Sequence, residues 1–105
     1  MGNTLKRNNI RESMSINEYK LLYTIYDENY KIIKIGPAKN VLDLKNKNKI
    51  DKLILYKNSD ENIKNKINIF VNTKNISKDE KIYYDSSNKN IIVVIGIHEY
   101  KNSYI

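Results

Sequence analysis

The single histidine of the chain, His98, is the side chain best suited to acid–base chemistry near neutral pH, and it stands beside Glu99. A general base needs a group that orients it, and a carboxylate can serve. Adjacent residues of a strand point to opposite faces, however, so His98 and Glu99 cannot readily form a dyad. We predict a half-solvated histidine at a strand end, no catalytic residue and no enzymatic activity.

Pairs of adjacent acidic residues occur at positions 27–28, 60–61 and 79–80, each flanked by polar residues that favour turns. Carboxylates at loop tips can converge on a divalent cation. None of the pairs has the glycine-punctuated spacing of a calcium-binding loop, and without cysteine there is no thiolate zinc site. The sequence therefore predicts solvated turns, no bound metal and no cofactor.

Lysine and tyrosine are abundant. The chain has 19 Lys and Arg residues against 12 Asp and Glu, which gives a formal net charge of +7, and nine of its residues are tyrosine. Lysines gathered on one face could contact phosphates while exposed tyrosines stack on unpaired bases. Tyrosine is also a good anchor in protein interfaces. The excess of Lys, Asn, Ile and Tyr is equally typical of AT-rich coding sequences, so the charge by itself does not specify nucleic acid.

Some of these side chains are not required by any folding argument, and they are the binding candidates. They are Tyr26, Tyr30, Lys31, Lys34, Lys47, Lys49 and Tyr56.

At 105 residues the chain fits one domain, with residues 1–16 as a flexible arm and residues 17–105 as the folded unit. No apolar run approaches the roughly 20 residues of a membrane helix, and the basic start is not followed by the apolar core of a signal peptide. We therefore expect a cytoplasmic, intracellular protein without membrane contact.

Alternating apolar residues predict a strand over residues 18–27, a turn at residues 27–29 and a second strand over residues 30–36. Pro37 should end this hairpin and open a helix over residues 37–46, with Ala38, Val41 and Leu42 on its inner face. In this interpretation Ile33 and Ile35 belong to the core scaffold.

Further strands are predicted over residues 50–57, 67–71, 81–85 and 90–100, with a helical turn capped by Ser59 or Asp60 before residue 67. The last strand is β-branched throughout, which indicates a place at the centre of a sheet. The fold class that follows is α+β: an antiparallel sheet of about five or six strands with one or two short helices on one face.

Residues 23–44 resemble a pattern of small uncharacterised bacteriophage proteins, in which a Tyr-x-x-Tyr strand, an acidic turn and a second strand lead through glycine into a helix. The residues that carry the likeness are Tyr23, Tyr26, Asp27, Ile35, Gly36, Ala38 and Leu42. The resemblance implies a phage or mobile-element origin and no particular activity.

Together these features predict a non-enzymatic binding protein that docks a tyrosine- and lysine-bearing face or edge onto an acidic host protein or complex and inhibits it. Two alternatives stay open. One is nucleic-acid or nucleotide binding through Lys and Tyr, and the other is a self-assembling homo-oligomer formed through an exposed strand edge.

Overall fold

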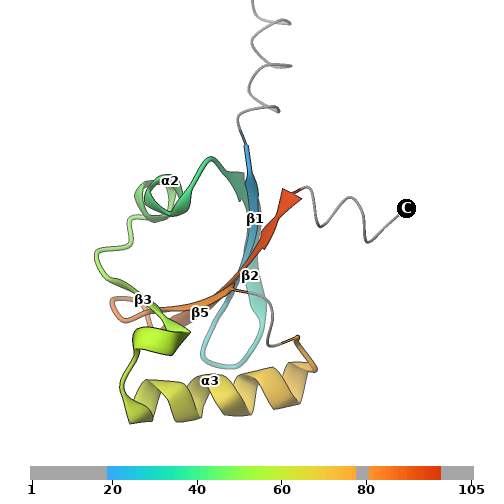
Figure 1. Cartoon of the computed structure of the whole chain (residues 1–105), viewed down its shortest axis with the longest axis vertical. Helices are drawn as coiled ribbons and strands as arrows, with labels where there is room; N and C mark the ends of the chain where they lie inside the picture. Colours follow the sequence, from blue (N-terminus) through green and yellow to red (C-terminus); the bar gives the residue numbers. More distant parts are fainter. Residues whose placement is uncertain (1–18, 78–80, 98–105) are drawn as a thin grey trace, which may run out of the picture.

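The computed structural model describes residues 19–77 and 81–97, which form one sheet with helices packed on it (Figure 1). The elements in chain order are β1 (Leu21–Tyr26), β2 (Ile32–Ala38), α2 (Val41–Lys47), β3 (Leu53–Leu55), the short 3₁₀ helix η1 (Tyr56–Asn58), α3 (Glu61–Lys74), β4 (Lys81–Asp85) and β5 (Asn90–Gly96).

The five strands lie in the order β2-β1-β5-β4-β3, and every neighbouring pair is antiparallel. The α+β class predicted from the sequence is thus confirmed. The β-branched strand β5 occupies the centre, as its composition indicates, because side chains on both of its faces must be covered. Strands β2 and β3 form the two edges.

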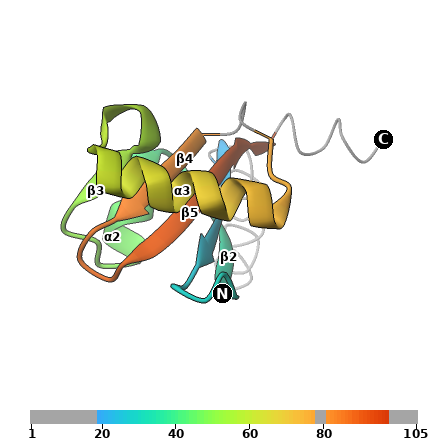
Figure 2. The same ribbon diagram turned by 90° about the horizontal axis from the view of Figure 1, so that it is seen from below.

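The two helices cover opposite faces of the sheet, where the sequence had indicated one shared face (Figure 2). Leu44 of α2 packs with Tyr23, Ile25 and Ile92. On the other face, three buried residues of α3 pack with alternate residues of β4 and β5; they are Ile67, Phe70 and Val71. The sheet therefore separates two small cores, the α2 core on the face covered by α2 and the α3 core on the face covered by α3, and strands β1 and β5 contribute to both.

Helix α3 replaces the predicted helical turn and strand, so the strand over residues 67–71 is wrong. Ile67, Ile69 and Val71 do alternate, but Ile67, Phe70 and Val71 also share one helical face, and this second pattern is the one buried. Ile69 is consequently exposed. The side chain of Asp60, one of the two predicted caps, accepts from the backbone N–H of Ile63 at 2.9 Å and starts the helix.

Pro37 does not start a helix. It lies inside β2, opposite Leu22 of β1, where an edge strand tolerates its missing N–H. Helix α2 begins four residues later, capped by Asn40, and its buried residue is Leu44, while Leu42 is 63% exposed. The predicted helix of residues 37–46 with Leu42 inside is therefore wrong in its start and in its inner face.

Several predictions fall on residues that lie outside the described ranges: the arm of residues 1–16, the acidic pair at 79–80, and His98 with Glu99. Within residues 19–77 and 81–97, no helix has both the length and the apolar character needed to cross a membrane. The same residues contain no cluster of three or more His, Cys, Asp or Glu side chains that could hold a metal ion.

Candidate functional site

The edge strand of the β1–β2 hairpin, β2, presents apolar side chains to solvent. Strand β2 has only β1 beside it in the described sheet, so its outer backbone groups lack a strand partner. Three of its isoleucines are more than half exposed: Ile32 at 53%, Ile33 at 55% and Ile35 at 57%. We call residues 31–35 the β2 edge. The backbone of Lys31 is already bonded to Asp27 within the β1–β2 turn. From Ile32 onward the edge combines outer backbone groups that lack a strand partner with exposed β-branched side chains, which favours pairing with another extended chain.

A β-bulge places these isoleucines. Ile25 lies opposite Lys34, but the next residue, Tyr26, lies opposite Ile32, so that Ile33 is the extra residue. Without the bulge, Ile32 and Ile35 would point to opposite faces of the sheet because they are three residues apart. With it, both share the α3 face, since Ile35 lies opposite Thr24 and Ile32 opposite Tyr26, a residue of the α3 core.

Neither helix covers the β2 edge. Helix α3 crosses the sheet at the end that carries the β1–β2 turn, and α2 packs at the other end, beside the last residues of β2 (Figure 1). Ala38, the final residue of β2, is fully buried in the α2 core. The exposed stretch is thus the part of β2 that lies between the two helices.

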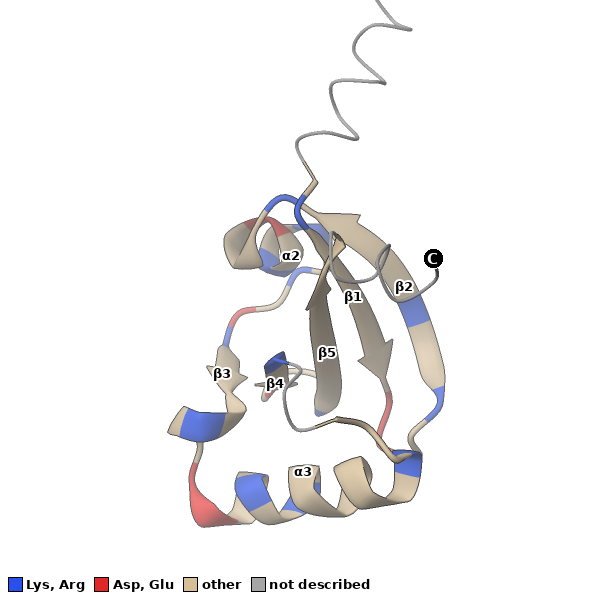
Figure 3. Ribbon diagram, turned by 45° about the vertical axis from the view of Figure 1, so that its right-hand side comes forward, with Lys and Arg blue, Asp and Glu red and all other residues tan. Residues whose placement is uncertain are grey.

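Lys31 and Lys34, two of the predicted binding residues, lie on this edge and are exposed. Lys34 lies opposite Ile25 and therefore on the α2 face, away from Ile32 and Ile35. Figure 3 shows other lysines distributed over α2, η1 and α3 as well, so the basic residues are not gathered on a single element. Among the described strands, the β2 edge is the place where lysine and exposed apolar side chains coincide.

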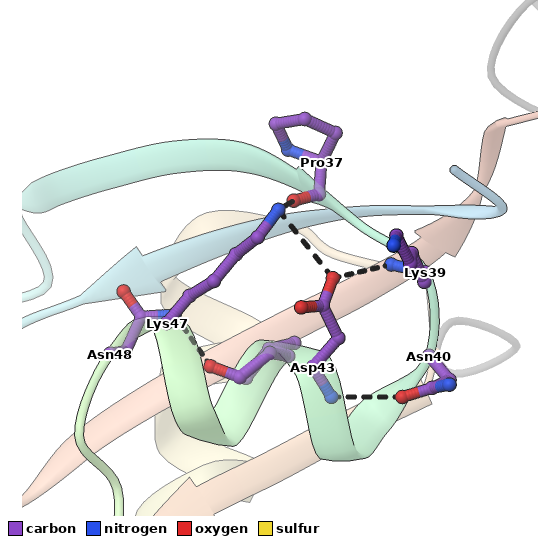
Figure 4. A network of polar contacts seen from close by, with 7 residues as sticks. Pro37, Lys39, Asn40, Asp43, Lys47 and Asn48 are labelled. Carbon is purple, nitrogen blue, oxygen red and sulfur yellow. Dashed lines mark hydrogen bonds and ion pairs between the residues drawn. The ribbon is translucent and has the colours of Figure 1, made fainter. Parts of the chain in front are cut away.

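Lys47, another predicted binding residue, has a structural role (Figure 4). Its Nζ donates to the Pro37 carbonyl at 3.0 Å, pairs with the Asp43 carboxylate at 3.5 Å and lies 4.5 Å from the centre of the Tyr19 ring. Lys47 therefore ties α2 to the end of β2. Because Pro37 has no N–H and its carbonyl already accepts, this end of the strand is closed to an incoming chain.

Asp43 completes the same network. Its carboxylate accepts from the backbone N–H of Lys39 at 2.8 Å, while its own N–H donates to the side chain of the cap, Asn40. The Lys39 hydrogen bond, followed by the positive charge of Lys47, lowers the pKa of Asp43 below its ordinary value despite partial desolvation. The network is charged at neutral pH and holds α2 in place.

Lys49 also has a structural explanation. It adopts a left-handed conformation (φ 53°) just after α2. Its N–H donates to the Asn46 carbonyl, and the N–H of Ile50 donates to the Lys45 carbonyl at 2.9 Å. This is a Schellman motif with lysine at the position that glycine usually takes, and the buried Ile50 provides the accompanying apolar contact.

The three predicted tyrosines pack against α3 or its entry. The rings of Tyr26 and Tyr30 make edge-on contacts with Phe70, with centroids 4.8 and 5.3 Å apart. The hydroxyl of Tyr56 donates to the side chain of Asn68. All three are only half-buried, but their contacts belong to the α3 core.

Sequence reasoning had assigned Ile33 and Ile35 to the core and so missed the apolar part of the β2 edge. The available signal was Pro37, because a proline inside an alternating pattern indicates an edge strand. In comparisons with protein-family models, with curated proteins and with solved structures, none matches this chain.

Proposed function

We propose that the chain is a non-enzymatic binding protein that adds an extended acidic segment of a partner protein to its sheet along the β2 edge. The observation that supports this most is the coincidence of three exposed isoleucines with an unpaired strand backbone. In strand addition the backbone hydrogen bonds supply affinity, and alternate side chains supply specificity.

Charge argues for an acidic partner and against a second copy of this chain. If two β2 edges paired, Lys31 and Lys34 of one molecule would lie close to the same two lysines of the other. Each molecule also carries a net charge of +7, which adds to the repulsion. Like charges directly opposite destabilise paired strands, whereas opposite charges contribute roughly 0.2–1 kcal/mol per pair. An incoming strand with Asp or Glu near these lysines gains on both counts.

The resemblance to bacteriophage proteins extends the proposal. The partner is then a protein of the bacterial host, such as a defence component. Binding of one of its segments to the β2 edge inhibits that protein. Small size is consistent with this mode of action, since blocking a surface needs no active site. Both the origin and the host target are part of the proposal.

A selection experiment tests the binding mode without knowledge of the partner. A yeast-displayed library of random peptides is sorted against the full chain, and the enriched peptides are then measured with variants. We expect enrichment of Asp or Glu together with β-branched residues, and a loss of affinity of at least about tenfold for Ile33→Lys.

The matched control is Ile69→Lys, because Ile69 is similarly exposed but lies on α3. Equal losses for both variants, or an enrichment without acidic residues, would contradict the proposal. So would sedimentation that detects a dimer which Ile33→Lys dissociates, since a second copy would then occupy the edge. Salt-dependent binding of an oligonucleotide that Ile33→Lys leaves unchanged, with no peptide enriched, would point to nucleic acid instead.

A further inference from the structure

A hollow of about 220 Å³ lies where the β1–β2 turn, the β4–β5 turn and α3 meet. Tyr30, Tyr84 and Ile91 form its apolar wall. Tyr84 and Ile91 belong to the buried α3 core, so this wall is fixed by packing. The volume corresponds to about seven water molecules and is below the roughly 300–1,000 Å³ of pockets for drug-sized ligands.

Charges of both signs line the same hollow. Lys66 comes from α3 and Lys89 from the β4–β5 turn, while Asp27 and Glu28 come from the β1–β2 turn. Within the described part of the chain, neither lysine forms an ion pair with either carboxylate. Lys66 instead lies over the Tyr84 ring, with Nζ 5.8 Å from its centre. The hollow thus has separate positive and negative groups, with an apolar wall beside them.

The β1–β2 turn is held in an unusual conformation. Tyr30 has φ 64°, which is rare for a bulky residue. The Asp27 carboxylate accepts from the N–H groups of Asn29 and Lys31, and the Tyr30 N–H donates to the Asp27 carbonyl at 2.9 Å. One oxygen of Asp27 is therefore committed to the turn, and the other oxygen, together with Glu28, supplies the negative charge.

The β4–β5 turn is equally constrained. Asp85 is 1% exposed, and its carboxylate accepts from the N–H groups of Ser87 and Asn88 and from the side-chain amide of Asn88. Lys89 follows with φ 57°. Two residues of the lining, Tyr30 and Lys89, thus close the two hairpin turns in a left-handed conformation, which fixes their place beside the hollow.

We propose that this hollow binds a small zwitterion, specifically a free α-amino acid with an apolar side chain. The ligand carboxylate lies near Lys66 and Lys89, its ammonium group lies near Asp27 and Glu28, and its side chain packs on Tyr30 and Ile91. A nucleoside monophosphate suits the hollow less well, because its phosphate would approach two carboxylates and its base and ribose need more room.

The test is a titration of the full ¹⁵N-labelled chain with L-leucine and L-phenylalanine, monitored by backbone amide shifts. We expect saturable shifts at millimolar concentration confined to residues of the two turns and to Lys66. N-acetyl-leucine lacks the positive charge and leucinamide lacks the negative charge, so each should bind at least about tenfold more weakly.

Variants of the chain show which residues bind the carboxylate of the ligand and which bind its ammonium group. Lys66→Ala should weaken binding of L-leucine and leave that of leucinamide unchanged, whereas Glu28→Gln should weaken L-leucine and leave N-acetyl-leucine unchanged. Lys64→Ala, on the same helix but outside the lining, should change neither. The proposal is overturned by the absence of saturable shifts, by equal binding of the three leucine compounds, or by phosphate or a nucleoside monophosphate binding the same residues more tightly. Because the β2 edge is unaltered in these variants, the outcome is independent of the proposed strand addition.

Discussion

Lys47 closes one end of the exposed strand: its Nζ lies 3.0 Å from the carbonyl oxygen of Pro37, which is a residue without a backbone donor. Lysine and proline at an edge are devices that discourage uncontrolled strand pairing. Here Lys47 and Pro37 protect the last part of β2 and leave residues 32–35 open. The strand edge is therefore restricted in length, which suits a short partner segment better than a growing sheet.

Removal of the Lys47 side chain should destabilise the fold. Lys47→Ala loses a hydrogen bond, a partly buried ion pair and a contact with the Tyr19 ring, so we expect a decrease of about 1–2 kcal/mol in the free energy of unfolding. Urea denaturation measures it. Lys45→Ala in the same helix is the control and should cost less than about 0.5 kcal/mol. Equal effects of the two variants would show that Lys47 does not tie α2 to β2.

The stability of the α2 network should depend on pH through Asp43. The pKa of Asp43 in the folded chain lies below its ordinary value of 3.8, chiefly because its carboxylate accepts from the Lys39 N–H. Its stabilising contribution is therefore complete above pH 3.8 and is lost as the pH falls through the lowered folded pKa. Thermal unfolding of wild type and Asp43→Asn should give a difference in Tm at pH 7 that narrows in more acidic buffer. A difference that stays constant or widens on acidification would contradict the assignment.

Gly36 should not tolerate a larger side chain, because the ring of Tyr23 lies across it. A Cβ at Gly36 would be 3.0 Å from the Tyr23 hydroxyl and 3.2 Å from its Cζ, and Tyr23 is buried. We expect Gly36→Ala to cost about 1–3 kcal/mol of stability. Since the hydroxyl is the nearest atom, the same change should cost less in a Tyr23→Phe background. A double-mutant cycle with no coupling between the two positions would refute this contact.

Lys49 offers a stabilising substitution. Its left-handed conformation costs a non-glycine residue roughly 1 kcal/mol, and its carboxyl-terminal position in the α2 cap is the one that glycine prefers. Lys49→Gly should therefore raise the free energy of unfolding by about 0.5–1 kcal/mol. Asn75 has the same conformation after α3, but asparagine tolerates it better, so Asn75→Gly should give a smaller gain. A loss of stability in Lys49→Gly would argue against the cap.

Local patterns were sufficient for the elements that obey a single periodicity. In β1, Leu21, Tyr23 and Ile25 pack on the α2 side of the sheet and Tyr26 on the α3 side, and the β-branched residues of β5 account for its central place. The pattern at Ile67–Val71 satisfied two periods at once, and tertiary packing, such as that of Phe70 against Tyr26 and Tyr30, decides for a helix. Local sequence could not settle this, because the partners are some 40 residues away in the chain.

The candidate site was predictable in part. Lys31 and Lys34 were recognised because a core does not need them, and both are exposed, Lys31 just before β2 and Lys34 within it. Ile33 and Ile35 were assigned to the core because alternation does not reveal a bulge or which strand ends the sheet. Lys66 and Lys89 meet at one hollow only through the pairing of β4 with β5 and the placement of α3. Such convergence depends on tertiary structure and leaves no local signal.

The most direct measurement of strand addition is backbone amide NMR of the full chain with a selected acidic peptide. If the peptide pairs with β2, intermolecular NOEs should connect its backbone to Ile33 and Ile35, and the outward amides of residues 32–35 should become protected from hydrogen exchange. Lys34→Glu should weaken the complex, whereas Lys57→Glu on η1 should not. NOEs to α3 or to the β3 edge, with β2 amides unchanged, would contradict the account.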